Sequence, residues 1–174
     1  MEKRKVLKFC ACFVEEDDES KCVENAIIID DLSENPIEKI EDIFIEANDP
    51  EAIYYLALTK DTNVLKLEKA LIETGDVDYI FDFVKNVKGA DVSEAEDAII
   101  RINKPFYINE FAEKIKGANI KKLEDAIIAT NNAMFIFFFA KQVKGADLDR
   151  LEDALLEFDD LTYYQRFQKE LRLA

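Results

Sequence analysis

The chain of 174 residues contains no histidine and no tryptophan, and its only serines are Ser20, Ser33 and Ser93. Histidine is the commonest general acid or base in enzymes, so its absence removes the usual means of proton transfer near neutral pH. None of the serines lies in a nucleophile-elbow motif, and the sequence has no glycine-rich phosphate-binding loop. These absences argue against an enzyme, and we predict a protein without catalytic residues or a cofactor.

Long apolar runs are lacking as well. The most apolar stretch, residues 133–140, is far shorter than the roughly 20 residues that cross a bilayer as a helix. Lys3, Arg4 and Lys5 precede an apolar stretch, as in a signal peptide, but acidic residues 15–19 follow where a small-residue cleavage site would lie. We therefore predict a soluble protein that does not bind a membrane.

Cysteine is sparse and odd in number, with Cys10, Cys12 and Cys22 as the complete set. This usage is typical of a reducing compartment and predicts a cytoplasmic protein. Three thiols without histidine do not complete a four-ligand zinc site, and residues two apart on a helix point in different directions. Residues 15–19 lack the ligand spacing of a calcium loop. We predict buried thiols, a solvated acidic loop and no bound metal.

Basic residues are outnumbered, 23 against 38 acidic ones, which gives a net charge of −15 at pH 7. Such a charge repels nucleic acid and anionic membranes and attracts basic protein surfaces. With 49% hydrophobic residues and 13 phenylalanines the chain has enough apolar side chains to fold. The predicted partner is a protein with a basic surface, and a nucleic-acid-binding enzyme is one such protein. Nucleic acid itself is not a predicted partner.

The few glycines mark an internal repeat. Gly89, Gly117 and Gly145 recur 28 residues apart in near-copies of one phrase, Lys-Gly-Ala followed by Asp or Asn, and Gly75 marks the other turn of the unit. A second phrase, Leu123–Ile128 in one of its copies, contains a glutamate that recurs first after 27 residues and then every 28 residues. An earlier copy, residues 23–28, is interpreted as a truncated unit. Repeats of this period indicate a stacked array of helical units, which usually binds other proteins. The recurring glutamates are Glu41, Glu68, Glu96, Glu124 and Glu152.

Each unit is predicted to form two helices. The first helix follows an N-cap residue (Asn63, Asp91, Asn119 or Asp147), and the second follows Asp49, Asp76, Lys104, Asn132 or Asp160. The predicted fold is an all-α solenoid of stacked helical hairpins, with about five repeats of 27–28 residues plus the truncated N-terminal unit. It forms a single domain over residues 1–174, with a divergent cap at 1–36, core repeats at 37–147 and a C-terminal capping repeat at 148–174. Around residues 6–13 we favour a degenerate helix, with a short β-strand as the alternative.

These phrases, together with Thr74-Gly75-Asp76, make residues 37–171 resemble the short helical-hairpin repeats of bacterial and phage proteins, which are HEAT-like in architecture. The resemblance implies an α-solenoid that serves as a scaffold. It implies no particular activity, because such repeats support unrelated functions.

The recurring glutamates could bind metal ions along the array, or they could stabilise the contacts between its helices as a structural ladder. We favour the structural ladder, in which each glutamate pairs with a lysine that ends the previous helix. The variable aromatic positions of the second helices are the better candidates for partner binding or for a homodimer contact. The alternative for Phe137 and Phe138 is that they cover a gap against an adjacent helix or the chain end. The partner-binding candidates are Phe137, Phe138, Tyr54, Tyr55, Leu58 and Phe81.

Asp97, Asp125 and Asp153 recur in line and form a candidate acidic row, with Asp42 in the first unit and Lys69 interrupting it. The predicted function is a non-catalytic protein–protein interaction module, an acidic scaffold or adaptor that binds a basic protein surface. The alternative is a phage-type acidic inhibitor that mimics nucleic acid and blocks a defence enzyme such as a CRISPR effector or restriction enzyme. That alternative requires carboxylates clustered at phosphate-like spacing on one face.

Overall fold

A computed structural model describes residues 5–12, 22–29, 36–59 and 61–173. The last two ranges form ten α-helices, followed by one turn of π-helix, η1 (Gln168–Arg172). None of these described helices is long and apolar enough to cross a membrane. The helices are α1 (Pro36–Glu46), α2 (Pro50–Ala57), α3 (Val64–Thr74), α4 (Val77–Asn86), α5 (Val92–Ile102), α6 (Pro105–Lys114), α7 (Ile120–Ala129), α8 (Ala133–Gln142), α9 (Leu148–Leu156) and α10 (Thr162–Phe167).

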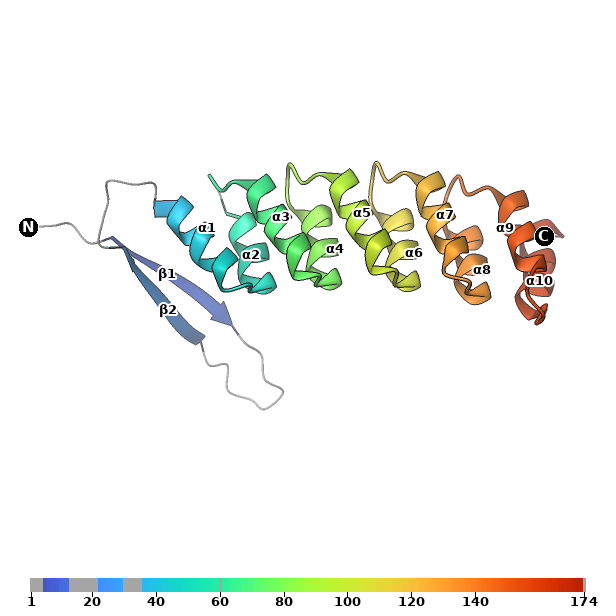
Figure 1. Ribbon diagram of the computed structural model, residues 1–174, viewed down its shortest axis with the longest axis horizontal. Helices are drawn as coiled ribbons and strands as arrows, with labels where there is room; N and C mark the ends of the chain where they lie inside the picture. Colours follow the sequence, from blue (N-terminus) through green and yellow to red (C-terminus); the bar gives the residue numbers. More distant parts are fainter. Residues whose placement is uncertain (1–4, 13–21, 30–35, 60, 174) are drawn as a thin grey trace, which may run out of the picture.

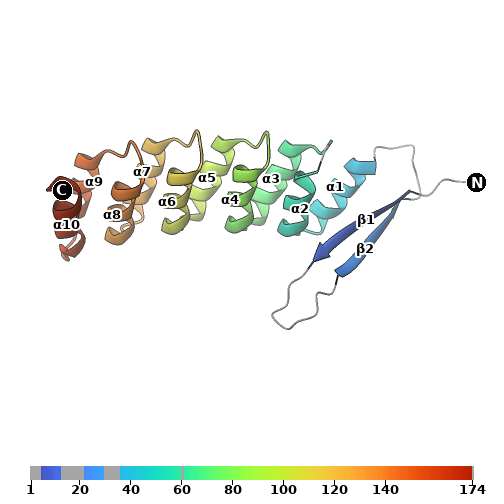
Figure 2. The ribbon, with the colours of Figure 1, turned by 180° about the vertical axis from the view of Figure 1, so that it is seen from behind.

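The ten helices pack as consecutive hairpin pairs in a single row (Figure 1). The odd-numbered helices form one layer and the even-numbered helices the other, as the view from behind makes clear (Figure 2). Helices contact their neighbours in sequence, such as α4 with α5, and also the equivalent helix of the next hairpin, such as α4 with α6. The prediction of an all-α array of stacked helical hairpins is therefore confirmed for residues 36–173 as described.

Local sequence signals set the helix boundaries. The side chains of Asn63 and Asp91 accept hydrogen bonds from backbone amides in the first turns of α3 and α5, as expected of N-caps. Helix α3 ends at Gly75 and α5 at Asn103, both in the left-handed conformation, which glycine and asparagine adopt most readily. The last helix departs from prediction by one residue, because α10 begins at Thr162, with Leu161 at the N-cap position, and not directly after Asp160. The Asp160 side chain still accepts a hydrogen bond from the Thr162 N–H, at 3.0 Å.

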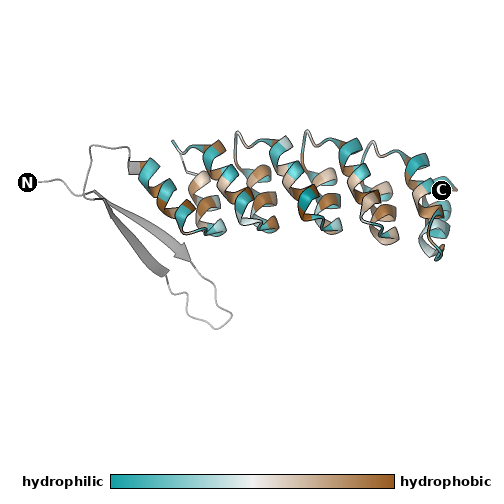
Figure 3. Ribbon diagram, in the orientation of Figure 1, coloured by the Kyte–Doolittle hydropathy of each residue, from teal (hydrophilic) through white to brown (hydrophobic). Residues whose placement is uncertain are grey.

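The core lies between the two layers and runs the length of the array. Apolar and polar residues alternate along the helices (Figure 3), and the buried apolar side chains of both layers form one core cluster. The predicted inward positions are buried, with Leu67, Ile99 and Ile127 from the odd helices and Phe111 and Phe139 from the even ones. Each hairpin therefore completes its core only against its neighbours, as expected of a repeat array.

The N-terminal segment is a two-stranded antiparallel hairpin, β1 (Lys5–Cys12) and β2 (Cys22–Ile29), and the prediction of a degenerate helix there is wrong. The prediction of a truncated repeat unit at residues 23–28 is wrong as well, because this copy of the phrase lies in β2. In the strand register Cys12 lies opposite Cys22, so the helical spacing expected of the cysteines does not apply and does not separate these two residues. The acidic loop at 15–19 lies outside the described residues.

Candidate binding site between α3 and α5

The recurring glutamates join each hairpin to the next. A glutamate of one odd helix accepts a hydrogen bond from the backbone N–H of the residue that caps the next odd helix. The distance is 2.7 Å from Asn63 N to Glu41, 2.6 Å from Asn119 N to Glu96, and 2.8 Å from Asp147 N to Glu124. The three carboxylates are buried. Burial of a carboxylate is tolerated when it is hydrogen-bonded, and here it satisfies an amide that a helix N-terminus leaves free.

A cation completes this arrangement at three junctions. The third residue of the next odd helix is lysine or arginine, and it reaches back to the buried glutamate and to the exposed aspartate beside it. The distance from Lys122 Nζ to Glu96 is 3.2 Å, and the hydrogen bond to Asp97 is the main cause of a raised Lys122 pKa. We call this set the glutamate ladder. Lys66 bridges Glu41 and Asp42, Lys122 bridges Glu96 and Asp97, and Arg150 bridges Glu124 and Asp125.

The structural interpretation of the recurring glutamates is therefore supported, but the predicted partners are wrong. The glutamates bind the start of the following odd helix, not the lysines that end the preceding even helix. At the end of the array the chain supplies substitutes, because Glu152 accepts hydrogen bonds from the side chains of Gln168 and Arg172. The C-terminal turn thus supplies Glu152 with the hydrogen-bond donors that the next odd helix supplies at the other junctions.

The junction between α3 and α5 departs from this pattern. Glu68 is buried, and the Asp91 N–H donates to both of its oxygens at 2.9 Å. The position of the cation is taken by Glu94, and the position of the exposed aspartate by Lys69. Neither Glu68 nor Lys69 forms an ion pair with any described residue, so this junction holds a buried carboxylate without a cation.

The electrostatics of Glu68 follow from this arrangement. Burial raises the pKa of the Glu68 carboxyl above its ordinary value, and the Asp91 amide offsets part of that rise. The nearby Asp91 and Glu94 carboxylates raise the Glu68 pKa further. The charged form is thus disfavoured in the folded protein, and a cation placed beside Glu68 would relieve that cost.

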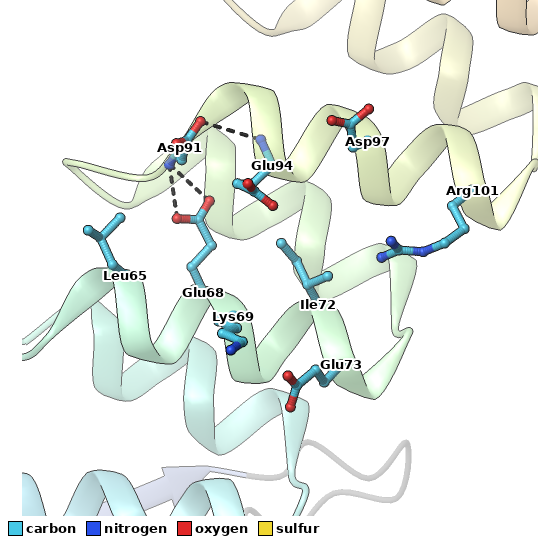
Figure 4. Close-up of a pocket in the computed structure, with 9 residues that line it drawn as sticks. All are labelled: Leu65, Glu68, Lys69, Ile72, Glu73, Asp91, Glu94, Asp97 and Arg101. Carbon is cyan, nitrogen blue, oxygen red and sulfur yellow. Dashed lines mark hydrogen bonds between the residues drawn. The ribbon is translucent and has the colours of Figure 1, made fainter.

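A pocket of about 480 Å³ opens at this junction, on the odd-helix layer (Figure 4). The Glu68 carboxylate points toward the Asp91 amide, and Arg101 reaches back from the end of α5. Five carboxylates line it against two basic groups. Leu65 adds an apolar wall although it is 63% exposed. The lining residues are Leu65, Glu68, Lys69, Ile72, Glu73, Asp91, Glu94, Asp97 and Arg101.

Two of the six partner-binding candidates lie in the core. Phe137 has no exposed surface, and Phe81 is also buried, so their assignment as partner contacts is wrong. The reason is that their column lies between successive even helices. The ring centroid of Phe137 lies 6.0 Å from that of Tyr163, and the guanidinium carbon of Arg166 lies 4.6 Å from the Phe137 ring. Phe137 therefore covers the terminal hairpin, as the alternative stated, whereas Phe138 is only partly buried.

The second aromatic group lies at the other end of the array. Tyr54 and Tyr55 are in contact, with ring centroids 5.2 Å apart, and Tyr55 and Leu58 are exposed. The hydroxyl of Tyr54 accepts a hydrogen bond from Asn86 at 3.0 Å. Two hairpins, α3–α4 and α5–α6, lie between this group and Phe138, so the structure does not bring the candidates into one site.

Two of the three aspartates in the acidic row pair with basic residues. Asp97 pairs with Lys122 at 2.5 Å, and Asp125 pairs with Arg150. Asp153 is exposed and forms no ion pair among the described residues. A basic residue thus accompanies two of the three carboxylates, and these two do not present a bare row of negative charge.

Sequence reasoning missed the α3–α5 pocket. The signal was present, because alignment of the units places Glu94 in a column with Lys66, Lys122 and Arg150. It also missed an aromatic column on the even helices, in which each side chain is partly exposed. That column is Tyr79, Tyr107, Phe135 and Tyr163. Comparison of the chain with protein families, with curated proteins and with solved structures finds no match.

The pKa of Glu68 leads to a pH prediction. Below its ordinary value of 4.5 the group is protonated in both the folded and the unfolded state. As the pH rises toward the higher folded pKa, the unfolded state ionises first, so the contribution of Glu68 to stability falls. We expect the free energy of unfolding of the wild type, minus that of Glu68→Gln, to decrease between pH 4.5 and 7. Urea unfolding across this range measures it. A difference that rises with pH would show that the Glu68 carboxylate is stabilised by its surroundings.

Proposed function

We propose that this protein is a non-catalytic protein–protein interaction module, an acidic helical-repeat scaffold that binds a basic protein surface in the cytoplasm. The observation that carries the proposal is the α3–α5 pocket. There the array holds a buried carboxylate without a cation, within a set of five carboxylates and two basic groups. Opposite charges at an interface steer association and favour partners of the complementary sign.

The wider chain supports the same function. The net charge of −15 attracts basic proteins over a distance set by the salt concentration. Stacked hairpins expose a long surface on which a partner can bind. The HEAT-like repeats of bacteria and phages that this chain resembles serve as scaffolds. Exposed apolar side chains such as Tyr55 and Phe106 add contact area for a partner or for a second copy of the chain.

The alternative, an inhibitor that mimics nucleic acid, has weaker support. It needs uncompensated carboxylates at phosphate-like spacing. The exposed aspartates Asp42, Asp97 and Asp125 each pair with a lysine or arginine, so they are not uncompensated carboxylates.

The test is capture of partners from nuclease-treated lysate on the immobilised protein, followed by elution in a salt gradient. Two variants with the same net charge locate the contact. Glu73→Gln/Glu94→Gln removes two charges from the pocket, and Asp82→Asn/Glu113→Gln removes two from the even helices. We expect a basic protein that the wild type and the even-helix variant retain, and that the pocket variant releases at lower salt.

Equal retention by both variants would remove the pocket from the binding surface. Capture of a nucleic-acid-processing enzyme that DNA then displaces from the wild type would favour the mimic. Recovery of no basic protein would contradict the proposed function.

A further inference from the structure

We propose that the α3–α5 pocket binds one arginine or lysine side chain of a basic partner protein, whose cationic head takes the place that Lys66, Lys122 and Arg150 occupy at the other junctions. This inference rests on the proposed function, because it names the group of the partner that the acidic face recognises.

The repeats themselves show which group fits. In three copies of the same junction the buried glutamate holds a protein ammonium or guanidinium within 3.1–3.3 Å. Glu68 has the same depth and the same bond to the next N-cap amide. Its geometry therefore matches three known binding sites for a cationic side chain within this chain, and it lacks only the residue that supplies one.

The departures from the repeat converge on this pocket. Glu94 replaces the cation, and Lys69 replaces the aspartate. Leu65 stands where the next three units have Ser93, Lys121 and Asp149, and its exposed side chain lines the pocket. An apolar wall beside a buried carboxylate suits lysine and arginine, because both carry an apolar stem behind a charged head.

The two basic residues of the pocket do not replace the missing cation. Neither Lys69 nor Arg101 forms an ion pair with any described residue. The volume of about 480 Å³ exceeds the need of one side chain and leaves room for the partner's adjoining backbone.

The experiment uses backbone amides as local reporters. The Asp91 amide binds Glu68, and the equivalent amides of Asn119 and Asp147 serve as internal controls. The probe is acetyl-Gly-Arg-Gly-amide, with its lysine counterpart and its neutral citrulline counterpart, titrated in physiological salt and followed by nitrogen–proton NMR. We expect the arginine and lysine peptides to shift Asp91, with little effect on Asn119 and Asp147, and the citrulline peptide to shift none of them.

A matched variant, Lys69→Asp/Glu94→Lys, gives this junction the same glutamate, aspartate and lysine set as the α5–α7 junction, and we call it the ladder-restored variant. We expect it to fold and to bind the peptides at least about tenfold more weakly, because its own lysine holds Glu68. Spermidine tests a free polyamine as the source of the cation. A spermidine shift at Asp91 larger than that of either peptide would overturn the assignment to a protein side chain.

Equal shifts at all three amides would show counterion binding and overturn the proposal, as would no shift at millimolar peptide. These results are separable from those of the capture experiment. If the ladder-restored variant still retains the captured protein, the pocket assignment fails and the proposed function stands. If the peptides shift Asp91 but no basic protein is captured, the pocket binds cations and the proposed function fails.

Discussion

Phe137→Ala is expected to lower the free energy of unfolding by about 3–5 kcal/mol, the usual cost of truncating a fully buried phenylalanine. Phe137 has no exposed surface, and it packs against Tyr163 and Arg166 of the last hairpin. Its loss would leave a cavity between α8 and α10 that the rigid helices cannot close. Urea unfolding followed by circular dichroism measures the change.

Phe138→Ala is the matched control. The same aromatic ring is removed one residue along α8, but from a partly exposed position. We expect a stability loss of about 1 kcal/mol, with any larger effect confined to partner binding or self-association. Equal losses for the two variants would contradict the distinction between a core residue and a surface residue.

Glu124→Leu is expected to cost about 2–3 kcal/mol, because it breaks the glutamate ladder without removing much volume. The Asp147 N–H would lose its acceptor, at 2.8 Å in the folded protein, and Arg150 would lose one of its two carboxylates. Replacing one partner of such a set costs more than replacing the whole set by apolar groups. Thermal or urea unfolding tests the prediction.

Two variants separate the parts of this effect. Glu124→Gln keeps an acceptor for the Asp147 N–H and should cost less than Glu124→Leu. Asp125→Asn changes an exposed carboxylate that pairs with the same Arg150, and should cost less than about 1 kcal/mol. If Asp125→Asn were as costly as Glu124→Leu, the buried amide contact would not be what holds the hairpins together.

The helical array could be predicted because its signals are local and repeated. N-cap residues such as Asn63 and Asp91, and the left-handed joint at Gly75, act within a few residues of themselves. The helical spacing of apolar residues then selects the buried side of each helix. Four or more copies of one pattern support the same helix boundaries, so a wrongly placed boundary in one unit disagrees with the others.

The N-terminal segment could not be predicted in this way. Residues 23–28 carry nearly the same phrase as Leu123–Ile128, yet they lie in β2 and pair with β1. The β-branched residues Val23, Ile27 and Ile28 suit a strand as well as a helix. For a short segment without caps, pairing with another strand outweighs local preference.

The candidate site was missed for a different reason. Phe137 looked exposed because its column varies among the units, but the variation reflects packing between successive even helices. The ladder is a contact between residues 22 or 23 positions apart, which periodicity within one helix does not reveal. Glu94 can be recognised as the replacement of a cation only after the structure shows that Lys66, Lys122 and Arg150 bind the buried glutamates.

The most direct measurement is the affinity of the captured basic protein for three forms of the chain, by isothermal titration calorimetry at physiological salt. The forms are the wild type, the ladder-restored variant and the even-helix variant Asp82→Asn/Glu113→Gln. We expect at least about tenfold weaker binding by the ladder-restored variant and nearly unchanged binding by the even-helix variant. Equal affinity for all three forms would contradict the claim that the α3–α5 pocket recognises a basic partner.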